Sequence, residues 1–173
     1  VPHIGQFVGR VAILDLGIKR STIDHMINRG LVVTVLPASA SIDTVLAAKP
    51  DAVFFSNGPG DPSASAAQVA LLKEILERRI PFFGICFGNQ LLGRALGFDT
   101  YKLPFGHRGI NQPILDRTTG RVEVTAHNHG FAVRVPGGET GDLVNSPAGF
   151  GKVRVSHVNL NDDCVEGLEC VDI

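Results

Sequence analysis

The sequence has few of the residues that build disulfide frameworks, metal fingers and membrane spans. Among 173 residues there are three cysteines, one tyrosine, one methionine and no tryptophan. Three cysteines without a CxxC pair do not make a disulfide framework, and they suit a reducing, cytoplasmic compartment. No HExxH or paired CxxC motif occurs, so we expect no metal site, His127 and His129 included. No apolar run reaches the ~18 residues of a membrane helix, so we expect no contact with a membrane.

An excess of charge of one sign is also absent. Lys and Arg number 16 and Asp and Glu number 17, which gives a formal net charge of -1. Such a surface has no long-range field that would attract nucleic acid, so we expect no nucleic-acid partner. The hydrophobic share of 44%, with 20 Gly and 10 Pro, is typical of a globular domain with many turns.

The chain length fits one domain with a sizeable core. Residues 1–10 begin at Val1 with a short mixed segment, which we interpret as the tail of an upstream linker or domain. Residues 11–173 are predicted to form the domain itself. We expect it to be truncated at its C-terminus, because the chain stops just after a strand-like stretch at residues 165–170.

Apolar runs alternate with segments of helical spacing in the first hundred residues. The runs lie at residues 11–15, 31–36, 52–56 and 81–85, and the helical segments at 20–29, 41–48, around 69–76 and 89–96. This alternation predicts an α/β fold of the flavodoxin-like type, an open and mainly parallel sheet with helices on both faces. From Thr100 onward, short strands separated by Gly, Asn and Pro turns predict antiparallel strands added at an edge of the sheet in the C-terminal half.

The most informative segment is Gly84-Ile-Cys-Phe-Gly-Asn-Gln90, which lies between a predicted strand and a predicted helix. Its pattern is the GxSxG nucleophile elbow with cysteine in place of serine. The elbow predicts that Cys86 is a nucleophile at the carboxyl end of a strand, where open α/β sheets bind ligands. We also expect the helix N-terminus to lower the pKa of its thiol. Cys164 and Cys170 have no such setting, and no role is predicted for them.

A second loop, Asn57-Gly-Pro-Gly-Asp-Pro62, follows the third strand and should lie at the same edge as Cys86. It lacks the Lys and Ser/Thr of a Walker phosphate loop, so phosphate binding is not indicated. Two interpretations stay open: an ordinary turn, or a turn whose backbone N–H groups serve as hydrogen-bond donors. A thiolate that attacks an amide creates an oxyanion that needs such donors. The N–H groups of Gly60 and Phe87 are the candidates.

These residues resemble a known family. Gly84-Ile-Cys-Phe-Gly-Asn-Gln90 is similar to the nucleophile motif of class I glutamine amidotransferases, and the Asn57 to Pro62 loop is similar to their oxyanion strand. Further segments resemble the small, glutamine-hydrolysing subunit of carbamoyl-phosphate synthases. These segments are residues 14–19, 105–113, 126–133 and 155–161.

The resemblance implies hydrolysis of L-glutamine to glutamate, with Cys86 as the catalytic residue. The ammonia would pass to a partner, the carbamoyl-phosphate synthase large subunit, for pyrimidine and arginine biosynthesis. No cofactor is implied for this domain, since ATP and Mg are used by the partner subunit. The positions that the resemblance assigns to glutamine binding are Gly58, Gly60, Phe87, Gln90, Asn128, Gly130 and Phe131.

The chain departs from the family pattern at two places. Asn89 stands where many relatives have histidine, and a mild effect is expected. The His-Pro-Glu segment that supplies the family's base and its orienting carboxylate is absent, and it would be expected just beyond Ile173. The chain alone is therefore predicted to lack the catalytic His and Glu.

Two alternatives stay open at this stage. The chain could be a non-catalytic docking domain, or a related flavodoxin-like cysteine hydrolase. Four histidines in loops and strand-like segments are predicted to be structural and not to act as the base. They are His107, His127, His129 and His157.

Overall fold

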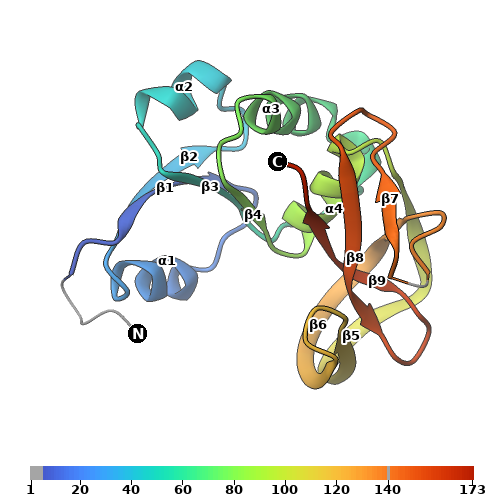
Figure 1. The fold of residues 1–173 in the computed structure, drawn as a ribbon. Helices are drawn as coiled ribbons and strands as arrows, with labels where there is room; N and C mark the ends of the chain where they lie inside the picture. Colours follow the sequence, from blue (N-terminus) through green and yellow to red (C-terminus); the bar gives the residue numbers. More distant parts are fainter. Residues whose placement is uncertain (1–5, 140) are drawn as a thin grey trace.

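The computed structural model describes residues 6–139 and 141–173, and these fold around two β-sheets (Figure 1). The elements are β1 (Gly9–Asp15), α1 (Arg20–Ile27), β2 (Leu31–Pro37), α2 (Ile42–Ala47), β3 (Ala52–Phe55), a short 3-10 helix (Pro62–Ala64), α3 (Ala66–Glu77), β4 (Phe82–Gly84), α4 (Phe87–Ala95), β5 (Asp99–Asp116), β6 (Arg121–Arg134), β7 (Leu143–Asn145), β8 (Lys152–Asn159) and β9 (Val165–Cys170). The predicted upstream segment 1–10 overlaps the start of β1, and residues 1–5 lie outside the described residues.

The first sheet is parallel, with the strand order β2-β1-β3-β4. Because side chains alternate along a strand, Ile13 and Phe54 point to one face and Leu14 and Phe55 to the other. The first pair packs with residues of α1, while the second joins the main core with α3 and α4. Helices therefore cover both faces, as predicted (Figure 1).

The C-terminal half forms an antiparallel sheet with the order β5-β6-β9-β8-β7. The antiparallel strands were predicted, but they form a sheet of their own and do not extend the edge of the parallel sheet. Helix α4 explains the separation, since its buried face packs between the sheets. A Cβ on Gly93 of α4 would lie 2.6 Å from the side chain of Val133 in β6, so the two surfaces are in close contact.

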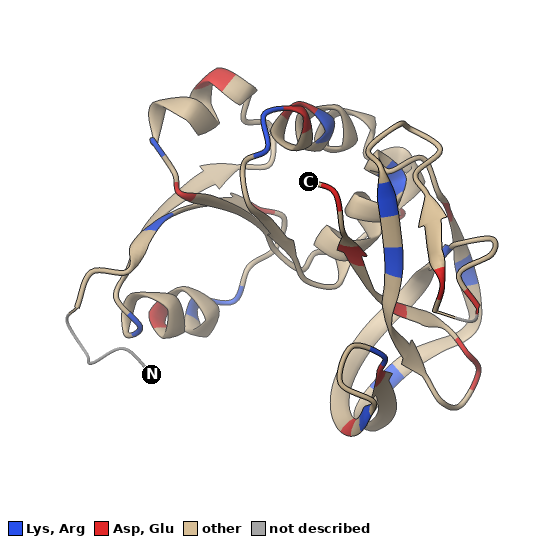
Figure 2. Ribbon diagram, viewed as in Figure 1, with Lys and Arg blue, Asp and Glu red and all other residues tan. Residues whose placement is uncertain are grey.

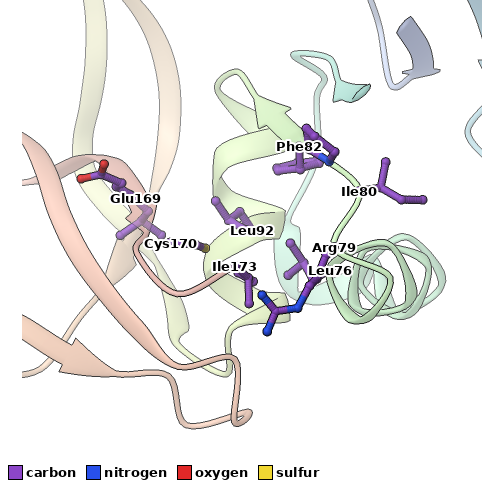
Figure 3. A pocket seen from close by; sticks show the side chains of 10 residues that line it. Leu76, Arg79, Ile80, Phe82, Leu92, Glu169, Cys170 and Ile173 are labelled. Carbon is purple, nitrogen blue, oxygen red and sulfur yellow. The ribbon is translucent and has the colours of Figure 1, made fainter. Parts of the chain in front are cut away.

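Strand β4 is an edge strand, because among the described strands it pairs only with β3. Phe83 is 63% exposed and Ile85 is 43% exposed beside this edge. A cavity of about 400 Å³ lies between β4, α3, α4 and the C-terminal segment (Figure 3). Arg79 at the end of α3 donates a hydrogen bond to the carbonyl of Asp172 (3.3 Å), which brings the C-terminal residues to this side of the sheet.

Charged residues of both signs are spread over the helices and strands (Figure 2). This distribution agrees with the balanced composition, since neither sign dominates the chain. No helix in the described part of the chain is long and apolar enough to cross a membrane.

Candidate active site

Cys86 lies in a sharp turn between β4 and α4, in a conformation that L-residues rarely adopt. Its backbone angles are φ 55° and ψ -105°, and α4 begins at the next residue. A Cβ on Gly84 would collide with the backbone of Gly88, and one on Gly88 would collide with the carbonyl oxygen of Phe55. The predicted elbow is therefore confirmed, and both glycines are required by close backbone approach. The predicted helix start at residue 89 is two residues late.

An open cleft of about 690 Å³ contains Cys86. All eight residues that the sequence assigned to catalysis or ligand binding line this one cleft. They are Gly58, Gly60, Cys86, Phe87, Gln90, Asn128, Gly130 and Phe131. The first two come from the loop after β3, the next three from the elbow and α4, and the last three from β6. The cleft therefore lies between the two sheets and is built from both.

The thiol of Cys86 faces opposing electrostatic effects. Burial raises its pKa, and the negative charge of Glu166 raises it further. The backbone N–H groups of Phe87 and Gly58 hydrogen-bond the sulfur and lower the pKa, but they are outweighed. The net pKa is raised, so the predicted lowering by the helix terminus is wrong. The helix start was visible in the sequence, whereas the burial and the nearby carboxylate were not.

Backbone donors reach the sulfur from two sides of the cleft. Those of Phe87 and Gly58 act on the sulfur and lower its pKa. Gly60, the second predicted donor, lines the same cleft with φ 112°, and a Cβ there would meet no atom within 4 Å. The role of Gly60 as an oxyanion donor stays a prediction, while Gly58 adds an N–H that the sequence had assigned only to ligand binding.

Gln90 and the segment around Asn128 are tied to each other. Gln90 is 6% exposed, and its side-chain amide donates a hydrogen bond to the carbonyl of Phe131 (2.7 Å). The carbonyl of Asn128 lies 4.0 Å from the sulfur of Cys86. The NH₂ group of the Gln90 side chain thus holds β6 against α4, and this contact fixes the position of the cleft wall.

Three basic residues that the sequence did not single out also line the cleft: Lys19, Lys102 and Arg108. Lys19 lies in the short loop between β1 and α1, in one of the segments that carried the family resemblance. That position, at the carboxyl end of a strand, was a signal that could have identified it. Lys102 and Arg108 lie on β5, and only the fold of that strand brings them to Cys86.

A smaller cavity of about 170 Å³ is also lined by Cys86. It is lined by His127, His129 and Glu166, among other residues. Burial lowers the pKa of His127. For His129, burial is outweighed by the hydrogen bond and charge of Glu166, and its pKa is raised. For Glu166, burial is outweighed by the surrounding histidines, His129 foremost, and its pKa is lowered.

Glu166 was missed by the sequence analysis because it is a lone acid in β9 without a motif around it. His107, which we predicted to be structural, also contacts its carboxylate (2.8 Å). In the described residues no histidine side chain hydrogen-bonds the sulfur of Cys86, and the fourth histidine, His157, contacts Ser156 and Asp116 instead. Their exclusion as the base stays a prediction.

The comparisons with known proteins show the family of the chain. The family model "Glutamine amidotransferase class-I" matches residues 12–172. A carbamoyl phosphate synthase small chain from Streptomyces avermitilis is 58% identical over 172 residues, which is 99% of this chain and 44% of the relative. One from Mycobacterium tuberculosis is 52% identical over 171 residues, again 99% and 44%. The chain thus spans somewhat less than half the length of these curated relatives.

Solved structures resemble the fold at low sequence identity. A glutamine amidotransferase from Thermotoga maritima has a TM-score of 0.58 and 18% identity, covering 75% of this chain and 64% of that one. A glutamine amido transferase from Methylobacillus flagellatus has a TM-score of 0.55 and 17% identity, covering 78% and 59%. These likenesses support the α/β architecture.

Proposed function

Because this chain belongs to the class I glutamine amidotransferase family, we propose that it hydrolyses L-glutamine to glutamate and ammonia with Cys86 as the nucleophile. We further propose that the ammonia is used to make carbamoyl phosphate, for pyrimidine and arginine biosynthesis. One observation carries the proposal: Cys86 stands at a strained turn in a cleft that all the predicted glutamine-binding residues line.

The chemistry begins when the sulfur of Cys86 attacks the side-chain amide carbon of glutamine. A carbon–sulfur bond forms, and the amide oxygen becomes an oxyanion. The N–H of Phe87 and those of the Gly58 to Gly60 turn are the donors for that oxygen, and each such donor contributes about 10²–10³ in rate. The intermediate then expels ammonia once the leaving nitrogen is protonated. Water hydrolyses the resulting thioester, which releases glutamate and restores the thiol.

Charge in the cleft favours an amino acid as ligand. Lys19, Lys102 and Arg108 line it together with Cys86, and they would attract the α-carboxylate of glutamine. Gln90 holds the Phe131 carbonyl in the wall of the cleft, so this wall is already in position when the ligand enters. These contacts act on ground and transition states alike, so they contribute to binding more than to turnover.

A proton acceptor is also needed, because a raised pKa keeps the resting Cys86 mostly protonated near neutral pH. We propose that the family's His-Pro-Glu segment supplies it, as the resemblance implies. Supporting this, none of the histidine side chains described here hydrogen-bonds the sulfur.

We propose the carbamoyl-phosphate synthase large subunit as the partner. The relatives are named small chains, which supports a larger companion. ATP and Mg would act on that subunit, and no cofactor is proposed for this domain.

The test is a Cys86→Ser variant of the whole protein, assayed with its synthetase partner. Glutamine-dependent carbamoyl phosphate synthesis should fall by about 10³-fold or more, because the nucleophile is lost. Synthesis from free ammonia should persist, since only the ammonia source is removed. Cys170→Ser is the matched control, because this cysteine is half-buried and outside the cleft. Glutamine-dependent synthesis that survives in Cys86→Ser would overturn the proposal.

A further inference from the structure

Three imidazole rings and one carboxylate converge from three strands of the second sheet. His107 lies on β5, His127 and His129 on β6, and Glu166 on β9. One nitrogen of each ring and a carboxylate oxygen all lie within 4.8 Å of one another. Every side chain in this group is only 9–12% exposed. The cluster is therefore a compact, nearly buried set of metal-ligating groups.

The shortest contacts within the cluster all involve nitrogens that point inward. Nδ1 of His107 lies 2.8 Å from the carboxylate of Glu166. Nδ1 of His127 lies 3.3 Å from the same carboxylate, and Nε2 of His129 lies 3.1 Å from it. The inner nitrogens of His127 and His129 are 3.1 Å apart.

The outer nitrogen of each ring is hydrogen-bonded to an oxygen outside the cluster. The pairs are His107 Nε2 with Asp162 Oδ2 (2.9 Å), His127 Nε2 with Thr125 Oγ1 (2.8 Å), and His129 Nδ1 with the carbonyl of Phe131 (2.9 Å). A carboxylate and a carbonyl can only accept, and Thr125 already donates its hydroxyl proton to the carbonyl of Gln112 (3.2 Å). When the inner nitrogens bind a metal cation, each ring therefore has an oxygen outside the cluster to accept the proton of its outer nitrogen.

In that state, three nitrogen lone pairs and a carboxylate face one another. The side-chain amide of Asn159 reaches Nδ1 of His107 at 3.3 Å, but this is a single neutral donor. Acceptors placed 3.1 Å apart repel unless a proton or a metal cation lies between them. Histidines that bind metals hold their other ring nitrogen in this way, with a carboxylate, a carbonyl or a similar oxygen as partner.

We propose that His107, His127, His129 and Glu166 bind one Zn²⁺ ion. Zinc takes imidazole nitrogen and carboxylate oxygen at about 2.0–2.2 Å in tetrahedral sites, which separates the ligand atoms by roughly 3.3–3.6 Å. The observed separations of 2.8–3.3 Å need only a small expansion to admit the ion. Four protein ligands leave no open position, which is the arrangement of a structural zinc site.

The ion would join strands where their pairing is thin. β6 and β9 pair at a single position, Val133 with Val165. The β5–β6 ladder shifts register between Lys102 and His107 and again between Gly109 and Gln112. A zinc ion would thus hold β5, β6 and β9 together. The site would lie beside the Cys86 cleft, because His129 belongs to the cluster and also lines the cleft.

The test measures metal binding and leaves glutamine turnover aside, so it can fail independently of the proposed function. The purified protein, stripped with a chelator, is titrated with Co²⁺ and then Zn²⁺. We expect one equivalent of each ion, the visible absorption of four-coordinate Co²⁺ and its loss when Zn²⁺ is added. Zinc should also raise the melting temperature. X-ray absorption should show nitrogen and oxygen ligands without sulfur.

Variants test whether zinc binds at the proposed cluster or at other side chains. Glu166→Gln and His127→Gln should weaken zinc binding by about 10²-fold or more, and Thr125→Val by about 10–100-fold. Thr125→Val removes one hydroxyl from the surroundings and keeps the inner ligands, so it remains informative if a ligand variant does not fold. His157→Gln, on β8 outside the cluster, and Cys86→Ser should bind zinc as the wild type does. Absence of a stoichiometric ion, a sulfur ligand, or unchanged affinity in folded Glu166→Gln and Thr125→Val would overturn the proposal.

Discussion

At the residue scale, the turn at Cys86 places the sulfur where a nucleophile is needed, but it does not ionise the thiol. The turn projects the sulfur into the cleft, and two backbone N–H groups hydrogen-bond it. Burial and the charge of Glu166 nevertheless keep the thiol pKa above its ordinary value. The same N–H groups that would stabilise an oxyanion are therefore insufficient to ionise the resting thiol. Activation has to come from a base that acts when the substrate is bound.

The raised pKa of the Cys86 thiol predicts how its alkylation by iodoacetamide depends on pH. Because the thiolate is the reactive form, the rate should rise about tenfold per pH unit and keep rising past the ordinary cysteine pKa of about 8.5. The measurement is the rate of modification of Cys86 by mass spectrometry, with chelator present. Glu166→Gln should shift the profile to lower pH, because a negative charge is removed. A wild-type rate that is already constant at neutral pH would show that the pKa is lowered instead.

The sequence was sufficient to predict the residues of the elbow and the loop after β3. Cys86 and Gly58 lie in short motifs whose glycines have a local backbone reason. Glu166 and Arg108 could not be predicted, since they reach the site through the curvature and register of β5 and β9. The direction of the Cys86 pKa was mispredicted for the same reason, because burial depends on tertiary packing.

At the element scale, the contact of α4 with β3 depends on a missing side chain. A Cβ on Gly88 would collide with the carbonyl oxygen of Phe55, which is backbone and cannot rotate away. Gly88→Ala should therefore push α4 from the sheet and destabilise the fold by about 1–3 kcal/mol. For a chain of this size the melting temperature should fall by roughly 2–12 °C.

Thermal unfolding followed by circular dichroism measures this effect. Gly130→Ala is the matched control, because a Cβ there meets only the guanidinium of Arg108, at 3.8 Å. Equal melting temperatures for the two variants would contradict the predicted collision.

The elements of the first sheet follow from local pattern. Apolar runs predicted β1 to β4, and Ser41 does cap α2, its hydroxyl accepting a hydrogen bond from the N–H of Thr44 (3.3 Å). For the second sheet, only the presence of antiparallel strands was predicted, and neither their bounds nor their pairing. Its long β5–β6 hairpin is interrupted by register shifts around His107, and such irregularities depend on contacts with other strands.

At the scale of the whole molecule, the cleft lies at the junction of the two sheets. Cys86 comes from the first sheet, and Asn128 and Phe131 come from the second. The helix α4 joins them, with Gln90 bonded to Phe131 on one side and Leu91 fully buried on the other. The relative position of the sheets therefore sets the width of the cleft, which sequence patterns do not encode locally.

The open edge of β4 has a consequence for behaviour at high concentration. An unpaired strand edge is a template on which another chain can add a strand, and exposed apolar side chains make that addition favourable. Phe83 and Ile85 provide such side chains. We expect the isolated chain to aggregate as its concentration rises. Phe83→Lys should suppress this aggregation, measured by light scattering, whereas Val122→Lys on the distant β5–β6 hairpin should not. Equal protection by both variants would indicate a general effect of added charge, and aggregation would then not begin at β4.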